Sequence, residues 1–333
     1  AVSGIIYLTA YTNTNGDVRT RAQKAITEFG KFSNQLLLEE KLYKAVKEYA
    51  QTDEAKNLTA YKAKFLKETI EDFERNGLAL PAEKREELKK IRDKLSELGV
   101  QFSTNIAEAK DHLIVGEEEV EGLPEDYKKA RKTEEGKYKI DLTYPSYVPF
   151  MKYSKSDKAR KELYIKYKNR AADKNLDILK EILVLRQQMA EMLGYKTYAE
   201  YRISDRMAKT PENVWNFENE LIENLQTKAE KDIAELVAAK QEYTNDKSAS
   251  KINAWEASFY NNILLNTKYN LDAEEVKQYF ELNNVINGLF TISQHLYNVT
   301  FEETQDLPVW HEDVKAYNVK RDGNVIGRFY LDL

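Results

Sequence analysis

Apolar residues recur at helical spacing along most of the chain. Between Pro81 and Gly99, four of them lie three or four positions apart and so share one face of a helix: Leu88, Ile91, Leu95 and Leu98. Proline is favourable in the first turn of a helix, and glycine is common just past the last turn. The pattern predicts a helix that begins at Pro81 and is capped at its C-terminus by Gly99.

Other stretches show the same periodicity with recognisable ends. A helix is predicted over 176–193, with Gly194 as its stop, and another over 210–243, with a Thr-Pro pair at its start. Asp272 followed three residues later by Glu275 has the pattern of a capping box and marks a further helix start. Helices are also predicted over 17–32, 36–51, 59–76 and 281–296.

Strand signals are fewer. Residues 137–144 alternate between apolar and polar side chains, which predicts one short strand. Segments 314–320 and 325–333 flank an Asp-Gly step that tolerates the positive φ of a tight turn, so a terminal β-hairpin is predicted near 314–333. Because a hairpin is marginally stable alone and the chain stops within its second strand, we expect it to be a piece of a longer polypeptide.

The predicted fold class is therefore mainly α, with a short strand and a terminal hairpin. Turn-rich residues 117–136 and polar residues 245–251 are the best candidates for linkers. The predicted organisation has four parts: a helical region over 1–122, a linker with a short strand over 123–150, a second helical region over 151–300 and a hairpin over 301–333.

Composition excludes several classes of function. The 333 residues include no cysteine, which rules out disulfides, a thiol nucleophile, a zinc ribbon and an Fe–S cluster. The 51 basic and 56 acidic side chains are mixed, and the basic run 128–132 is flanked by acids, so nucleic-acid binding is not expected. The sequence shows neither an apolar run long enough for a membrane span nor a signal peptide. Since it begins with Ala1 rather than Met, we expect the natural N-terminus to lie upstream.

The three histidines are His112, His295 and His311. A zinc peptidase of the H-E-x-x-H type needs two histidines four positions apart on one helix face, with the glutamate as general base. The nearest two histidines here are 16 positions apart, and position 315, where His311-Glu312 would need its partner, is Lys315. We expect no catalytic and no metal-binding residue within this chain, and the three histidines are interpreted as structural.

Other catalytic signatures are also absent. The sequence contains no G-x-S-x-G, G-x-x-x-x-G-K or G-x-G-x-x-G pattern. Adjacent acids such as Glu117 and Glu118 are interpreted as a solvated surface, because acids are abundant. Aromatic residues at helical spacing, Trp255, Phe259 and Tyr260 among them, are interpreted as core. The residues alone thus indicate a helical scaffold without an active site.

Several segments carry a more specific signal. The sharpest is YPSYVPFMKYS at 144–154, and others in the same order are MLGYKTYAEY at 192–201, RMAKTP at 206–211, YFELNNVINGLF at 279–290, VWHEDV at 309–314 and FYLDL at 329–333. In these the chain resembles the thimet-oligopeptidase family of zinc metallopeptidases, which includes oligopeptidase A and peptidyl-dipeptidase. The resemblance covers about residues 8 to 333. One departure is Glu256 after Trp255, where relatives usually have aspartate.

The resemblance implies a multi-helical lobe of a two-lobed oligopeptidase that hydrolyses short peptides in a deep channel. The family's H-E-x-x-H motif and its third zinc ligand, a glutamate, follow the strand at which this chain ends. The resemblance therefore implies zinc in the full-length parent, none bound by this chain, and a non-catalytic channel wall that is inactive alone and completed by the missing catalytic half. Endopeptidase action and release of C-terminal dipeptides both stay open. The expected compartment is the cytoplasm, with the periplasm as the alternative.

Two other interpretations are kept. One is a helical scaffold or interaction protein without hydrolase activity. The other is a non-catalytic fragment that pairs with a separate catalytic chain. Neither composition nor helical periodicity distinguishes these from the peptidase, whereas the ordered segments favour the peptidase.

Overall fold

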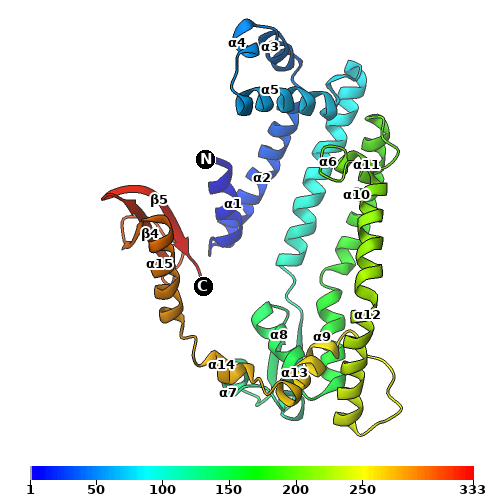
Figure 1. Cartoon of the computed structure of the whole chain (residues 1–333), viewed down its shortest axis with the longest axis vertical. Helices are drawn as coiled ribbons and strands as arrows, with labels where there is room; N and C mark the ends of the chain where they lie inside the picture. Colours follow the sequence, from blue (N-terminus) through cyan, green and yellow to red (C-terminus); the bar gives the residue numbers. More distant parts are fainter. Residues whose placement is uncertain (1) are drawn as a thin grey trace. The chain divides into compact units, whose positions relative to one another are not determined.

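The computed structural model describes residues 2–333 and is mainly helical, which confirms the predicted fold class (Figure 1). The helices are α1 (Val2–Thr12), α2 (Gly16–Leu37), α3 (Glu40–Ala50), α4 (Asp53–Lys56), α5 (Ala60–Phe73), α6 (Ala82–Ala107), α7 (Glu125–Arg131), α8 (Tyr144–Tyr153), α9 (Asp157–Lys168), α10 (Ala172–Met192), α11 (Tyr198–Ile203), α12 (Pro211–Thr244), α13 (Ala257–Lys268), α14 (Ala273–Lys277) and α15 (Leu282–Tyr297). The strands are β1 (His112–Val115), β2 (Tyr138–Asp141), β3 (Thr300–Thr304), β4 (Lys315–Arg321) and β5 (Asn324–Leu331).

The chain divides into two compact units. The larger unit is Ala25–Asn262, and the smaller unit combines the residues up to Lys24 with Ile263–Leu333. The boundaries predicted after residues 122, 150 and 300 stay predictions.

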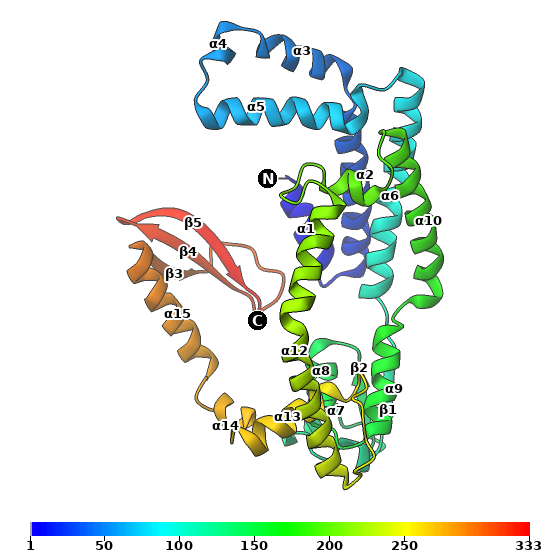
Figure 2. The same cartoon turned by 45° about the vertical axis from the view of Figure 1, so that its right-hand side comes forward.

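Helices α6 and α10 lie side by side in the larger unit (Figure 2). Their contact buries Leu88 together with Met189 and Ala190, and Tyr201 of α11 completes this cluster. Further along the same pair of helices, Leu98 packs against Ile178 and Ile182, with Phe102 beside them. The apolar stripe predicted on α6 is therefore the face that joins these two helices. On α10, Ile182 and Met189 lie in the contact as predicted, whereas Leu179 and Leu183, which were also expected to face inward, are exposed.

The end predicted for α6 was wrong. The helix continues through Gly99 to Ala107. An added Cβ at Gly99 would meet no atom within 4 Å, so nothing in the packing requires glycine or stops the helix there. The apolar spacing also continues from Leu98 to Phe102, which gives the next turn a buried partner. Gly194, by contrast, has a φ of 84° just after α10 and ends that helix as predicted.

Helices α3 and α5 form an antiparallel hairpin that leads into α6 through η1 (Glu74–Leu78), a π-helical turn. The α-helix predicted over 59–76 thus ends at Phe73, and the chain continues as the π-helical turn η1. Within η1, Gly77 has a φ of 104°, and a Cβ built on it would lie 2.5 Å from Leu88 Cδ2. Only glycine fits this position without displacing a core side chain.

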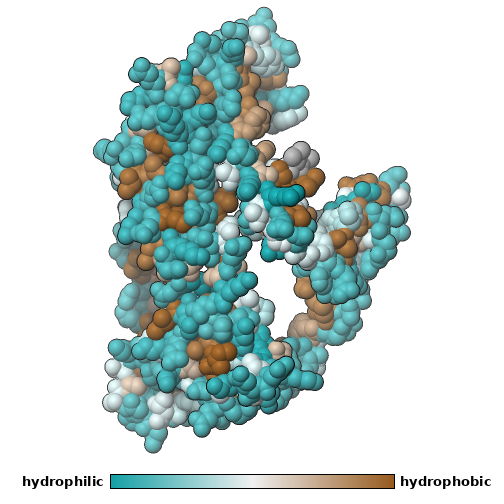
Figure 3. Space-filling model, turned by 180° about the vertical axis from the view of Figure 1, so that it is seen from behind, coloured by the Kyte–Doolittle hydropathy of each residue, from teal (hydrophilic) through white to brown (hydrophobic). Residues whose placement is uncertain are grey.

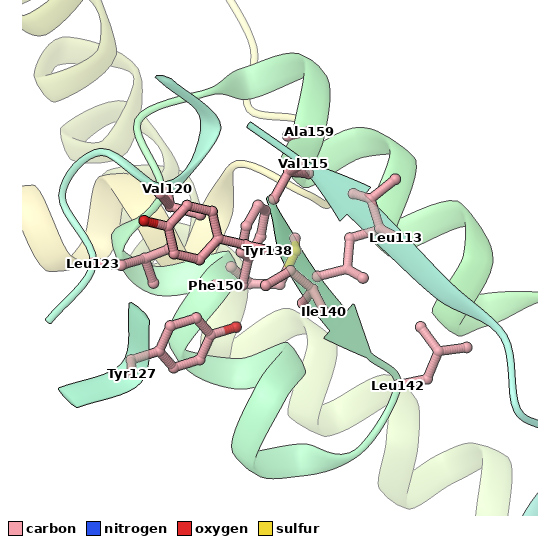
Figure 4. Close-up of a cluster of buried hydrophobic side chains, with 12 residues drawn as sticks. Leu113, Val115, Val120, Leu123, Tyr127, Tyr138, Ile140, Leu142, Phe150 and Ala159 are labelled. Carbon is pink, nitrogen blue, oxygen red and sulfur yellow. The ribbon is translucent and has the colours of Figure 1, made fainter. Parts of the chain in front are cut away.

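A separate core surrounds the two-stranded sheet of β1 and β2, which pair antiparallel with Leu113 opposite Ile140 (Figure 4). Helices α7, α8 and α9 surround it. The turn-rich segment 117–136 contains η2 (Glu118–Val120) and α7, and it contributes side chains to this core. The buried residues are Leu113, Val115, Val120, Leu123, Tyr127, Tyr138, Ile140, Leu142, Phe150, Met151, Ala159 and Leu163.

The strand predicted over 137–144 is present but shorter. Its alternating side chains Tyr138, Ile140 and Leu142 are buried, as the pattern indicates, but Tyr144 is exposed and begins α8. Thr143 is the N-cap of that helix and Pro145 lies in its first turn, a combination that starts helices and ends strands. The prediction failed at this end because the apolar alternation continued across a helix start.

Helix α12 confirms the prediction over 210–243. The Thr210 side chain accepts a hydrogen bond from the Asn213 amide at the N-cap, and Asn245 ends the helix with a φ of 53°. Trp215, Phe217 and neighbouring side chains are exposed, and Ala239 is the buried residue of the helix. Among residues 2–333, no helix has both the length and the apolar character needed to cross a membrane.

In the smaller unit, α15 packs on a three-stranded antiparallel sheet in the order β3-β4-β5. Phe290 of α15 lies against three rings of the sheet, with centroid distances of 4.8 Å to Phe301, 5.1 Å to Tyr317 and 6.1 Å to Phe329. The helix predicted over 281–296 is confirmed, with Glu281 as its N-cap. Strand β3 was not predicted.

The terminal hairpin is confirmed. Asp322 and Gly323 form its two-residue turn with φ of 49° and 78°, the left-handed conformation that this sequence favours. The register shifts once: Lys320 pairs with Val325 but Val319 pairs with Gly327, so Ile326 is an extra residue in β5. This β-bulge sets which side chains of β5 face α15.

Candidate functional site

The three histidines do not form one site. His112 lies in β1 of the larger unit, whereas His295 in α15 and His311 before β4 belong to the smaller unit. His311 Nδ1 lies 3.4 Å from Asp313 Oδ2. Across residues 2–333, no group of three or more histidine, aspartate or glutamate side chains is arranged to hold a metal ion. The expectation that no residue here is catalytic or metal-binding stays a prediction.

Residues 144–154 form the most specific of the segments that resemble the family. They contain α8 and pack into the core. The Tyr127 hydroxyl donates a 2.6 Å hydrogen bond to the Ser146 carbonyl oxygen, and burial raises the pKa of that hydroxyl. Arg131 donates to Ser146 Oγ at 3.1 Å and to the Pro145 carbonyl oxygen at 2.8 Å, while its guanidinium covers the Tyr127 ring. The polar groups of this segment are therefore used to hold α7 against α8.

A second buried network surrounds Arg160, whose side chain is 1% exposed. Its Nη1 donates to the Ser154 carbonyl oxygen at 2.5 Å, and its Nη2 lies 3.0 Å from Asp157 Oδ1. The same carboxylate oxygen accepts a 3.1 Å hydrogen bond from Trp255 Nε1. The guanidinium also lies 4.1 Å from the centroid of the Phe259 ring. Arg160 therefore joins α8, α9 and α13.

Glu256 supports the same region through a buried ion pair. Both of its carboxylate oxygens accept hydrogen bonds from Lys240 Nζ, at 2.7 and 2.8 Å, and one also accepts from the Asn253 amide at 2.7 Å. Burial opposes ionisation, but these hydrogen bonds outweigh it and lower the pKa of Glu256. Burial raises the pKa of neighbouring Tyr260 to about 12, so its hydroxyl stays protonated at neutral pH.

The candidate site for a ligand is an open cavity of about 850 Å³ in the larger unit. It lies where α5 and η1 meet the loops before and after α11, and its volume is within the range of small-molecule sites. It is rich in charged groups. The lining residues are Glu68, Glu71, Asp72, Glu74, Arg75, Leu193, Tyr195, Ser204, Asp205, Arg206 and Lys209.

Arg75 is the best-fixed charge in this cavity. Its Nη1 lies 2.9 Å from Asp205 Oδ1 and donates to the Tyr201 carbonyl oxygen at 3.1 Å. The guanidinium lies 4.9 Å from the centroid of the Tyr201 ring. A planar guanidinium held by these partners has a fixed orientation, and its positive charge is paired with the Asp205 carboxylate.

Apart from Glu74, the remaining charged side chains of the cavity come from two places in the chain. Helix α5 contributes Glu68, Glu71 and Asp72, which share a helix face at spacings of three and four. The connection between α11 and α12 contributes Arg206 and Lys209. Groups of both signs line one cavity, so it suits a polar ligand that itself carries both charges.

Glu74 at the cavity edge is held in its ionised form. Its Oε1 accepts hydrogen bonds from the Tyr43 hydroxyl at 2.6 Å and from Lys47 Nζ at 3.1 Å. The Tyr43 hydrogen bond is the largest cause that lowers the pKa of Glu74, and Lys47 adds to it. These contacts connect the α3–α5 hairpin to the cavity.

Reasoning from the sequence did not find this cavity. Arg75 and Asp205 are far apart in the chain, and neither belongs to a motif with a recognised spacing. Two features of the sequence lie close to the cavity. They are Gly77, whose positive φ shapes η1, and the family-like segment 206–211, which contains Arg206 and Lys209. The ion pair between Arg75 and Asp205 arises only when η1 and the loop after α11 are brought together.

Comparison with known proteins decides the family. The profile of peptidase family M3 matches residues 150–333, which is more than half of the chain. The chain belongs to peptidase family M3. This confirms the resemblance to the thimet-oligopeptidase family, and the matched residues include Arg160 and Glu256 with their partners.

Individual relatives extend the M3 similarity to the rest of the chain. The chain is 32% identical to oligopeptidase A of Escherichia coli (strain K12) over 336 residues, which cover 95% of this chain and 49% of that protein. It is 32% identical to the thimet-like oligopeptidase of Dictyostelium discoideum over 339 residues, 97% of this chain and 50% of that protein. It is also 32% identical to saccharolysin of Saccharomyces cerevisiae over 288 residues, 81% of this chain and 40% of that protein. The M3 chain thus spans about half the length of the first two relatives.

Proposed function

We propose that this M3 chain is the non-catalytic half of a zinc-dependent oligopeptidase that hydrolyses short peptides, and that the chain alone is inactive. The observation that carries the proposal is the match to peptidase family M3 in a chain that spans about half of relatives named oligopeptidases. The sequence contains no H-E-x-x-H motif, which supports a division of labour with a catalytic half.

Zinc belongs to the proposed whole protein rather than to this chain. The histidines lie in different elements, and the described residues offer no group of three side chains that could coordinate a metal ion. The residues present do not fit a zinc site, so no chemical step is assigned to them.

The role assigned to this chain is to form a wall of the substrate channel. A peptide carries a charge at each terminus and polar groups between them. The cavity around Arg75 is lined by charged groups of both signs, including a row of carboxylates, which supports binding of such a ligand. Both endopeptidase action and release of dipeptides are compatible with this proposal. We place the whole protein in the cytoplasm, and cell fractionation with an antibody tests that placement.

The test uses the purified 333-residue chain. Circular dichroism first establishes that it is helical, and it is then incubated with zinc and an internally quenched fluorogenic peptide, beside E. coli oligopeptidase A as the positive control. We expect no cleavage above buffer and no stoichiometric zinc by elemental analysis. Cleavage that a chelator abolishes would refute the proposed inactivity of this chain.

A further inference from the structure

Helix α15 carries an apolar face that is not used inside its own unit. One side of the helix packs on the sheet through Phe290. A second stripe, at spacings of three and four, is 45% to 71% exposed: Leu282, Val285, Leu289, Ile292 and Leu296. We call these five residues the α15 stripe. Figure 3 shows hydrophobic surface of this unit at the right of the view.

The composition of α15 is unusual for an exposed helix. Its sixteen residues include no aspartate, glutamate, lysine or arginine. A helix face in contact with water normally carries charged side chains, and one without them is typical of an interface. The lack of charge also limits the partner, because a charged surface would lose its hydration against this stripe without gaining an ion pair. The partner surface must therefore be apolar.

We infer that the α15 stripe binds the half of an M3 peptidase that this chain does not contain. This inference rests on the proposed function. Two observations select this occupant: the M3 profile includes α15 within the matched region, and relatives are about twice as long as the segment they share with this chain. A second copy of this chain is the main competing occupant, and the experiment separates the two.

The first experiment uses this chain and a second polypeptide, the part of E. coli oligopeptidase A that lies outside its alignment with this chain. The two are co-expressed, and the complex is measured by size-exclusion chromatography with light scattering. We expect a one-to-one complex. The double substitution Leu289→Glu, Ile292→Glu places carboxylates in the stripe and should weaken the complex by roughly tenfold or more.

The matched control is Leu176→Glu on α10. Leu176 is 58% exposed, similar to the two residues changed in the stripe, but lies in the larger unit. We expect it to leave the complex unchanged. Equal weakening by both sets of substitutions counts against a specific role of the stripe. A dimer of the isolated chain that the stripe substitutions convert to monomer assigns the surface to a second copy and refutes the inference.

A second measurement does not depend on association of separate parts. The chain is fused to the same E. coli half in one polypeptide, and the melting temperature is compared with and without Leu289→Glu, Ile292→Glu. We expect the substitutions to lower the melting temperature of the fusion and to leave that of the isolated chain unchanged. An unchanged fusion, or equal loss in both proteins, rejects the inference.

Peptidase activity of the fusion separates the two proposals. A fusion that depends on the stripe for stability but cleaves no peptide upholds the interface and counts against the proposed function. A fusion that cleaves peptides, with a melting temperature that is insensitive to the stripe, upholds the proposed function and refutes the interface.

Discussion

The guanidinium of Arg160 lies 4.1 Å from the centre of the Phe259 ring, and its side chain is almost completely buried. One residue comes from α9 and the other from α13, so this contact closes a long loop of the chain. The guanidinium also satisfies the Ser154 carbonyl oxygen after α8. A buried cation that serves three elements is an anchor of the larger unit rather than a site for a ligand.

We predict that Arg160→Met destabilises the chain by about 2–4 kcal/mol, because it leaves the Ser154 carbonyl oxygen without its donor and removes one of the two donors to the Asp157 carboxylate, which keeps Trp255. Urea denaturation followed by circular dichroism measures this change. Arg202→Met, at an exposed position of α11, is the control and should change stability by less than about 0.5 kcal/mol. Similar small effects from both substitutions would show that the buried network contributes little.

We predict that Gly77→Ala costs about 2–3 kcal/mol in the free energy of unfolding. Two effects add: the residue has a φ of 104°, and its new Cβ would approach Leu88 Cδ2 to 2.5 Å. Gly194→Ala separates them, since Gly194 also has a positive φ of 84° but no atom within 4 Å of its Cβ position. We expect the control to cost about 1 kcal/mol. Thermal denaturation of both variants checks the difference, and equal losses contradict the steric part.

The pH dependence of stability should report on Glu256. Its pKa in the folded chain is lowered, so its stabilising contribution is complete above the unfolded value of about 4.3 and is lost as the pH falls through the folded value. We predict that wild type is more stable than Glu256→Gln at pH 7, and that this gap narrows on acidification below about pH 5. Denaturation at a series of pH values measures the gap. Glu242→Gln, at an exposed position, is the control for the loss of one carboxylate from the surface.

A chelator should not change the stability of this chain. Metal sites that contribute to folding are lost when the metal is removed, and the melting temperature falls. The described residues offer no such site, so we predict the same melting temperature with and without a strong zinc chelator, measured by differential scanning calorimetry. A drop that added zinc reverses would reveal a site that the described residues do not show.

The helices were the predictable part of this fold. Helix α12 begins and ends close to the predicted positions because a Thr-Pro start and an extended periodic stripe are local signals. The terminal hairpin was predictable for the same reason, through its Asp-Gly turn. By contrast, β1 is only four residues long and exists because β2 pairs with it. The residues of a strand that depends on its partner show only a weak strand pattern of their own.

The family could be predicted from the sequence, whereas the buried network and the cavity could not. The ordered segments indicated the M3 family because they are contiguous sequence. The burial of Arg160 was not predictable, since arginine is rarely buried and its partner Phe259 lies far along the chain. The cavity around Arg75 was missed because its charges come from α5, η1 and the loop after α11, which meet only in the folded chain.

The bulge at Ile326 has a consequence for what lies beneath α15. Side chains alternate along a strand, so a single extra residue exchanges the two faces from that point onward. With it, Phe329 pairs with Tyr317 and joins the rings under Phe290. Without it, the neighbouring arginine, Arg328, would occupy that place and bring a cation into the aromatic layer. One inserted position near the turn thus decides between a ring and a charge at the centre of this small core.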